Sequence, residues 1–383
     1  EVGGDVIQFV EFIQFGVVTK GVRGPMPDTH RAARGWLAKR AGIAPLQGAS
    51  LSAAEIERCE RERVEAEEIR ACLTELAGIY HDELIANEEV MRWLTEHYAI
   101  QSETITRLRI GYASGVDAYS LLQQRGFAPE RIVSTGAFWP GGRPFFKHRL
   151  VFPYWSGGQV AYMIGRRTPW SENSPQESGK YKKLPVHDEA RHAHVSRAID
   201  NSLLFGEDIL ESRPKRLVIA EGITDAIVAQ QAGFATISPV TVRLKVADLA
   251  RLTGKLAGIE VAYIVPDNEL SGVGMDGALS TSAALGEVGV ENRIVLLPLA
   301  DSEARKRDEF AELLGAEGMA RFESLAASER KKLLEEHLAD RPEDLKRAHD
   351  PGTLVAEDHR EEPFRIRARA GELVGVADAG RLH

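Results

Sequence analysis

Four acidic side chains follow two apolar segments, 217–220 and 261–265, that we expect to be buried strands. They are Glu221 and Asp225 after the first segment, and Asp267 and Glu269 after the second. In open parallel α/β sheets, ligands bind beyond the carboxyl ends of the strands. If the two strands are neighbours, their ends bring these carboxylates into one cluster, and Gly222 allows a tight turn beside it.

Such a cluster is unfavourable by itself, because like charges raise one another's pKa. Bound cations remove that cost, and ligand sets made only of oxygen suit Mg²⁺ or Mn²⁺. These ions align in-line phosphoryl displacements. Each acid alone could be a loop residue, and Asp225 could equally well be a residue of a helix start. Together, Glu221, Asp267 and Glu269 predict catalytic metal ligands, with Asp225 as a fourth.

Strands and helices are expected to alternate from residue 214 to residue 315. Apolar segments predict strands, and amphipathic segments between them predict helices. The strands are 216–220, 234–240, 261–265 and 293–297, and the helices are 224–232, 246–256 and 278–288. Continuous apolar strands separated by helices are typical of a parallel sheet covered by helices, so the fold class is α/β.

A basic stretch precedes this sheet. The chain has a net charge of −9, yet residues 143–183 hold eight Lys and Arg residues against two acids. Nucleic acid responds to the local field rather than to the sum of charges. The expected phosphate contacts are Lys147, Arg149, Arg166, Arg167, Lys180 and Lys183, and Tyr181 could stack on a base. Taken singly, each could instead be a solvated charge or a core tyrosine.

The remaining segments divide between helices and a small sheet. A helix is expected at 31–40, a charged helix from Ser52, and further helices over 74–131. Strands at 145–154 and 160–164 flank a Ser156-Gly-Gly turn, and Pro153 predicts an edge or a strand end. Gly272 and Gly274 could form a phosphate-binding loop or a plain connector. Charged helices are expected from residue 316.

The two cysteines, Cys59 and Cys72, lie in the charged helix, ~20 Å apart at the helical rise. That is too far for a disulfide, so we expect free thiols and a reducing, cytoplasmic setting. No segment is apolar enough to span a membrane, and no secretory signal is visible. A loop with three histidines, at 187, 192 and 194, has irregular spacing and is expected to hold no metal.

The segment Glu221-Gly-Ile-Thr-Asp225, followed by Asp267-Asn-Glu269, resembles the Toprim signature. Toprim domains occur in DnaG-type primases, topoisomerases and some nucleases, so this motif implies a fold and a metal rather than one reaction. The second acid of the family's Asp-x-Asp motif is Glu269 here, and its longer side chain moves the ligating oxygen.

Several other segments resemble DnaG-type primases, in the family's order, from residue 1 to about 315. They are Gly3 to Val10, Trp36 to Ile43, Leu108 to Ala113, Phe146 to Pro153, Gly157 to Val160, Gly165 to Arg167, Gly179 to Pro185 and Leu204 to Gly206. Of the family's downstream acids only Asp308 matches, which makes it a further expected metal ligand. A family lysine falls near Asp200, so one phosphate contact is in doubt.

The resemblance implies five regions in the chain. They are the end of a zinc-binding domain at 1–20, a helical linker at 21–78, a basic mixed α/β subdomain at 79–213, a Toprim catalytic domain at 214–315 and a charged helical tail at 316–383. Zn²⁺ would belong only to a zinc module whose cysteines this sequence lacks. The tail does not match the family's helicase-binding domain.

The resemblance also implies a DNA primase, a DNA-directed RNA polymerase that makes short RNA primers for replication. Its partners would be single-stranded DNA template, RNA–DNA hybrid and NTPs, and a replicative helicase of the primosome is a further candidate. The alternative is a Toprim nuclease that uses the same acids on water. A third reading is a DNA-binding module without catalysis. A topoisomerase would need a domain with a nucleophilic tyrosine, and none is recognisable.

Overall fold

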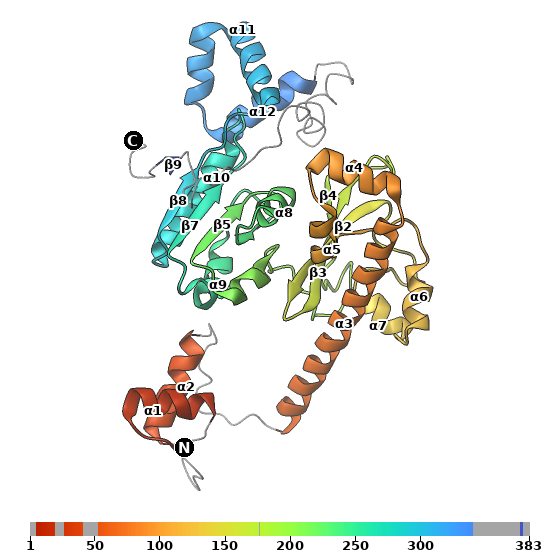
Figure 1. The fold of residues 1–383 in the computed structure, drawn as a ribbon, viewed down its shortest axis with the longest axis vertical. Helices are drawn as coiled ribbons and strands as arrows, with labels where there is room; N and C mark the ends of the chain where they lie inside the picture. The colour runs from red at the N-terminus through yellow and green to blue at the C-terminus, as the bar shows by residue number, and fades with distance from the viewer. Residues whose placement is uncertain (1–4, 20–26, 41–52, 176, 340–375, 378–383) are drawn as a thin grey trace.

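The computed structural model describes residues 5–19, 27–40, 53–175, 177–339 and 376–377. Two sheets lie side by side, and the long helix α3 (Ala53–Ile85) packs along the outer side of the antiparallel one (Figure 1). The α/β fold class is confirmed. Within the described ranges, no helix combines the length and the apolar character that a membrane span needs.

The second sheet of the chain is parallel, with strand order β6-β5-β7-β8 and a short antiparallel strand β9 beyond β8. Its strands are β5 (Arg216–Ala220), β6 (Thr236–Ile237), β7 (Val261–Val265), β8 (Asn292–Val295) and β9 (Val376–Ala377). The connecting helices are α8 (Ile223–Gln231), α9 (Val246–Leu256) and α10 (Val273–Glu287). The predicted alternation is therefore confirmed, and the predicted bounds of β5, α9 and β7 match residue for residue.

The first sheet is antiparallel, with strand order β1-β2-β3-β4. Its strands are β1 (Gly111–Tyr112), β2 (Arg149–Ser156), β3 (Gln159–Arg167) and β4 (Tyr181–Lys183). The predicted strand at 145–154 begins only at Arg149, after His148, whose φ of 47° interrupts extended backbone. The strand end predicted at Pro153 is wrong, because β2 continues to Ser156. However, β1 pairs only with Leu150 and Val151, so Pro153 lies on a local edge, where its missing N–H costs no ladder bond.

The first half of helix α3 is exposed to solvent, and its second half is buried. Its first half carries the exposed ion pairs of Arg63 with Glu60 and Glu67. Its second half contributes fully buried Leu73, Leu76 and Leu84 to the core under the antiparallel sheet. The helix runs without interruption across residue 78, where the expected linker ends. Cys59 is exposed and Cys72 is buried, and both are free thiols, as expected.

Four further helices complete the covering of the antiparallel sheet. They are α4 (Glu88–Tyr98), α5 (Ser102–Leu108), α6 (Ala118–Gln124) and α7 (Pro129–Ser134). A short 3₁₀ helix, η1 (Glu207–Ser212), leads into the parallel sheet. Before it, Phe205 exchanges two backbone hydrogen bonds with Ser238, and its ring meets Phe152 and Tyr154 edge-on. The core of the antiparallel part also includes Ala226 and Ile227 of α8, so the two sheets share packed residues.

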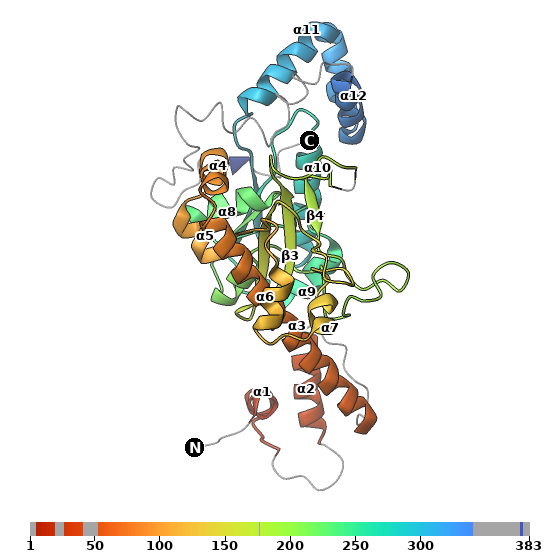
Figure 2. The same cartoon turned by 90° about the vertical axis from the view of Figure 1, so that its right-hand side faces the viewer.

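Two further pairs of helices lie toward the two ends of the chain. Near the N-terminus, α1 (Val6–Phe15) contacts α2 (Asp28–Arg40), and Asp5 and Gln8 form a capping box at the start of α1. Near the other end, α11 (Asp301–Ser324) and α12 (Ala327–Ala339) lie beyond α10 (Figures 1 and 2). The expected C-terminal helices are thus present up to residue 339, and residues 340–375 and 378–383 of the expected tail lie outside the described residues.

Candidate metal and nucleic-acid site

Neighbouring strand ends bring the predicted acids together. In the β5–β7 register Ala220 lies opposite Val265, so Glu221 and Asp267 both leave the sheet at its carboxyl edge. The backbone N–H of Asp267 donates to Oε2 of Glu221 at 3.2 Å. Asp225 follows one turn into α8. We call Glu221, Asp225, Asp267 and Glu269 the acidic cluster.

Gly274, in the first turn of α10, lies against this cluster. A Cβ atom at Gly274 would come within 2.5 Å of the carbonyl oxygen of Asp267 and within 2.9 Å of Oε2 of Glu221. The first contact is with backbone and cannot be relieved by a rotamer change, so only glycine allows this approach. A phosphate-binding loop or a plain connector was expected at Gly272 and Gly274. In the structure, Gly274 is the residue at which α10 comes into close contact with the acidic residues.

The acidic cluster is electrostatically unfavourable in the absence of a cation. The pKa of Asp267 is raised to about 7, first by burial and then by Asp225, Glu221 and Glu269 in that order, while Lys180 lowers it. Burial also raises the pKa of Glu221 and that of Asp225, and Lys180 again opposes both shifts. The Asp225 and Asp267 side chains are open to solvent on one side. Crowded carboxylates that keep a solvent-facing side are able to receive a cation.

Carboxylates are the right donors for Mg²⁺ or Mn²⁺. Across the described residues, however, no three His, Cys, Asp or Glu side chains already have the geometry of a metal site. Glu269 also turns part of its carboxylate elsewhere, since its Oε1 accepts a hydrogen bond from Ser271 Oγ at 2.7 Å. The residues therefore fit a divalent cation in type and charge, and their carboxylates would have to converge on it.

Asp308 has a different environment from the other predicted ligands. It lies on α11, its side chain is 68% exposed, and it pairs with the neighbouring Arg307. The α11 residue that reaches the loop after β7 is instead Glu303, whose Oε2 accepts a hydrogen bond from the N–H of Leu270 at 3.0 Å. Sequence reasoning missed Glu303, because its spacing matches no motif.

The antiparallel sheet contributes positive charge to the acidic cluster. Lys180 is exposed, just before β4, and its charge lowers the pKa of Glu221, Asp225 and Asp267 alike. Tyr181 is partly buried, and Asp225 and Asp267 raise the pKa of its hydroxyl, although burial is the larger cause. The predicted metal residues and the predicted Lys180–Tyr181 contacts thus lie within electrostatic range of one another.

Arg166 holds Tyr181 in place rather than lying on the surface. It is 5% exposed, and its Nη1 donates to the Tyr181 hydroxyl at 2.7 Å. Its guanidinium lies 4.7 Å from the centroid of the Tyr98 ring and 5.3 Å from that of Tyr181. Its charge lowers the pKa of Asp225. The structure does not place Arg166 on a phosphate-tracking surface, because the aromatic rings enclose it.

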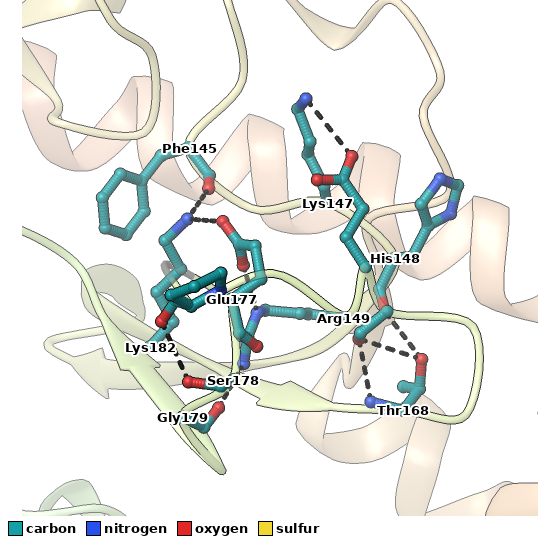
Figure 3. Close-up of polar contacts among 12 residues, drawn as sticks. Phe145, Lys147, His148, Arg149, Thr168, Glu177, Ser178, Gly179 and Lys182 are labelled. Atoms are coloured by element: carbon teal, nitrogen blue, oxygen red, sulfur yellow. Dashed lines mark hydrogen bonds and ion pairs between the residues drawn. The ribbon is translucent and has the colours of Figure 1, made fainter.

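Arg149 is also buried, at 1% exposure (Figure 3). Its Nε donates to Oε2 of Glu177 at 3.1 Å, its Nη2 to the carbonyl of Glu177 at 2.7 Å, and its Nη1 to the carbonyl of Gly179 at 3.1 Å. On the other side of Glu177, Lys182 donates to the second carboxylate oxygen and to the carbonyl of Phe145. We call Arg149, Glu177 and Lys182 the Glu177 network. It ties down the backbone immediately before Lys180.

The other predicted contacts are more accessible. Lys183 is exposed, Lys147 is partly exposed and lies 3.6 Å from Glu172, and Arg167 is half-buried and donates to Asn173. Burial and nearby Lys245 lower the pKa of Lys183. In the histidine loop, His192 and His194 lie against the Trp139 ring, and no metal geometry is present there within the described residues.

No protein-family model matches the chain. The chain is 25% identical over 191 residues to the DNA primase of Campylobacter jejuni, an alignment that covers 49% of this chain and 30% of that relative. It is similar, with a TM-score of 0.51 and 20% identity, to the Aquifex aeolicus primase structure of zinc-binding and RNA polymerase domains. That likeness covers 94% of this chain and 83% of the other.

The chain has the fold of a DnaG-type primase core. A second structure supports this, the RNA polymerase domain of Mycobacterium tuberculosis primase DnaG in complex with double-stranded DNA. The TM-score is 0.50 at 19% identity, over 76% of this chain and 99% of that domain. The resemblance to DnaG-type primases is therefore confirmed in sequence and in fold. The chain spans about a third of the length of the Campylobacter jejuni primase that it matches.

Proposed function

We propose that this chain is the catalytic core of a DNA primase, a nucleotidyltransferase that makes short RNA primers on single-stranded DNA. The observation that carries the proposal is the meeting of two unlike surfaces: the acidic cluster at the carboxyl edge of the parallel sheet and Lys180 with Tyr181 from the antiparallel sheet. The similarity to primases in sequence and fold supports this function over other phosphoryl chemistry.

Residues 214–315 would form a Toprim catalytic domain, with Glu221, Asp267 and Glu269 as the main metal ligands and Asp225 beside them. Bound Mg²⁺ or Mn²⁺ would neutralise triphosphate charge and help align a primer 3′-hydroxyl with the α-phosphorus of the incoming NTP. Asp308 would join only if its carboxylate left its pair with Arg307. Among the residues that the structure describes, no side chain has the surroundings of a dedicated general base.

The basic residues would bind phosphates of the template, the hybrid or the NTP. Lys180 is the best placed, because its charge already acts on the acidic cluster. Lys147, Arg167 and Lys183 would extend the surface, and Tyr181, held by Arg166, would present a fixed ring edge or face to a base. Arg149 would act indirectly, by holding the segment that ends in Gly179 and Lys180. A partner helicase and a zinc module stay predictions.

The test is nucleotide incorporation by the purified chain on single-stranded DNA with labelled NTPs and Mg²⁺ or Mn²⁺. A template with a pre-annealed primer separates extension from initiation, and Asp267→Asn is the matched control. Short RNA products or extension, lost in the variant, would establish the polymerase. Cutting of DNA that depends on metal and on Asp267, without incorporation, would establish the nuclease. Binding of DNA without either activity would leave the non-catalytic module.

A further inference from the structure

The loop between β7 and α10 carries Asp267 and Glu269, and its residues alternate between two environments. The backbone N–H of Asp267 donates to Glu221, so this residue faces the acidic cluster. Glu269 raises the pKa of both Glu221 and Asp267, so its charge acts on the same side. The residues between and after them, Asn268, Leu270 and Gly272, have partners elsewhere in the fold.

Those partners all belong to the segment that follows β8. Asn268 Nδ2 donates to the carbonyl of Leu297 at 2.7 Å. The N–H of Leu270 donates to Oε2 of Glu303 at 3.0 Å. The side chain of Leu270 packs against the small core that Phe310, Met319 and Phe322 form within α11. The loop is therefore held on the side away from the acidic cluster, at Asn268 and again at Leu270.

A third contact comes from α12. A Cβ atom at Gly272 would lie 2.5 Å from Nη2 of Arg330, so the guanidinium lies directly on the glycine that starts α10. Gly272 has a φ of 73°, which a side chain would strain further. The Nε of Arg330 is buried and has no hydrogen-bond partner among the described residues. The guanidinium on α12 therefore lies against the turn that starts α10.

Glu303 itself is held in one conformation. Its side chain and that of Lys306 are each 13% exposed, and Lys306 Nζ donates to Oε1 of Glu303. One carboxylate oxygen is thus taken by Lys306 and the other by Leu270. A largely buried carboxylate with both oxygens bonded is a rigid anchor for a backbone N–H, because the loss of either partner would leave a buried charge less well compensated.

From this alternation we infer that Glu303, on α11, is a positioning residue for the metal ligands on the loop between β7 and α10. The inference rests on the proposed function, since it assigns the support of the same acidic cluster. Outer contacts that orient ligating carboxylates typically change metal affinity about tenfold or more when removed. Glu303 touches no reacting atom; it acts through Leu270 on the two ligands that flank Asn268.

The experiment uses the full chain and three variants. Glu303→Ala removes the acceptor, Glu303→Gln keeps an oxygen for Leu270 while losing the charge, and Glu312→Ala changes an exposed glutamate on the same helix. Hydrogen exchange of the segment around Leu270 is measured without metal. Mn²⁺ affinity is measured by electron paramagnetic resonance without nucleotide. Thermal melting checks that each variant is folded. If Glu303→Ala does not fold, the test is made with Glu303→Gln.

We expect Glu303→Ala to speed exchange at Leu270 and to weaken Mn²⁺ binding about tenfold, with Glu303→Gln and Glu312→Ala close to the unaltered chain. Unchanged exchange and affinity in Glu303→Ala would overturn the inference. Equal damage in Glu303→Gln would overturn it too, because the Lys306 pair rather than the Leu270 bond would then matter. Mn²⁺ binding that is insensitive to Asp267→Asn would instead reject the metal site of the proposed function, while the exchange result would still test the anchor.

Discussion

Two charged regions of this protein, the Glu177 network and the acidic cluster, follow opposite rules. In the Glu177 network every charge has a partner: Arg149 and Lys182 flank one carboxylate, and together they hold the pKa of Glu177 below its usual value despite burial. In the acidic cluster the carboxylates face one another, and the pKa of Asp267 rises to about 7. The first arrangement is satisfied by the fold, and the second is not.

The difference separates structural charge from functional charge. A buried, fully bonded ion pair stabilises one backbone arrangement and has no remaining capacity for a ligand. A cluster of like charges destabilises the fold slightly and gains by binding a cation. The two regions meet at Gly179 and Lys180. Arg149 of the Glu177 network bonds the carbonyl of Gly179, and the next residue, Lys180, is exposed and acts on the acidic cluster. Substitutions in the Glu177 network should therefore reduce stability, and substitutions in the acidic cluster should reduce activity.

The largest effect is expected for Asp267→Asn. Incorporation should fall by a factor of about 10³, comparable with the loss of one preorganised electrostatic group at a transition state. The metal-free protein should melt no earlier than the unaltered chain at pH 8, because the amide removes one repelling charge. Single-turnover kinetics and calorimetry measure the two properties. A variant that loses activity and stability together would place Asp267 with the structural charges.

The second effect is expected for Arg149→Met, which keeps the length of the side chain and removes its charge and donors. Two carbonyls and part of the Glu177 carboxylate would lose their partners, so the free energy of unfolding should fall by about 3 kcal/mol. Urea denaturation measures it. Glu177→Gln and the double variant complete a cycle, which should show strong coupling. A loss below about 1 kcal/mol would mean that the network is not structural.

The parallel sheet and its acids were readable from the sequence because the signals are local. Continuous apolar segments and the acids after them predicted β5, β7 and the meeting of Glu221 with Asp267. The burial of Arg149 and Arg166 was not readable. An arginine in a basic stretch has the same local sequence whether it faces solvent or a carboxylate brought in from 28 residues further along the chain. The composition of a segment gives the number of its charges but not which of them form ion pairs in the fold.

The role of Glu303 was hidden for a related reason. It lies 33 residues after Leu270, in a helix whose pattern of charges is typical of a solvated surface. The contact depends on how α11 lies against the loop after β7, which no periodicity specifies. Pro153 shows a smaller version of the same limit. Its chemistry correctly indicated an edge, but the length of β1, and not the proline, decides where the edge begins.

A third, smaller effect is expected for Lys180→Ala. The side chain is exposed and outside the Glu177 network, so stability should change by less than about 0.5 kcal/mol. Binding of single-stranded DNA or of NTP should weaken about tenfold, and the dependence on salt should become shallower by about 0.7 if a strand phosphate is contacted. Fluorescence titrations at several salt concentrations measure both. Lys183→Ala removes a second lysine of the same proposed surface and should weaken binding less than Lys180→Ala; an equal loss would mean that position relative to the acids is unimportant.

The smallest effect concerns pH. The pKa of Asp267 rises from 3.8 in the unfolded chain to about 7 in the fold, so the folded state holds this proton more tightly. Its contribution to stability is therefore present below pH 3.8 and is lost as the pH rises to about 7. Because Asp267 is solvent-exposed, we expect only about 1 kcal/mol across this range.

Urea denaturation of the metal-free chain and of Asp267→Asn, from pH 4.5 to pH 8, separates the contribution of Asp267 to stability from those of the other carboxylates. The difference between the two proteins should grow with pH in favour of the variant and level off above pH 7. Mg²⁺ at pH 8 should reverse it, because the cation compensates the ionised cluster. Lys180→Ala should move the change to higher pH, since Lys180 lowers the pKa of Asp267. A flat difference would show that the acidic cluster is as well satisfied as the Glu177 network.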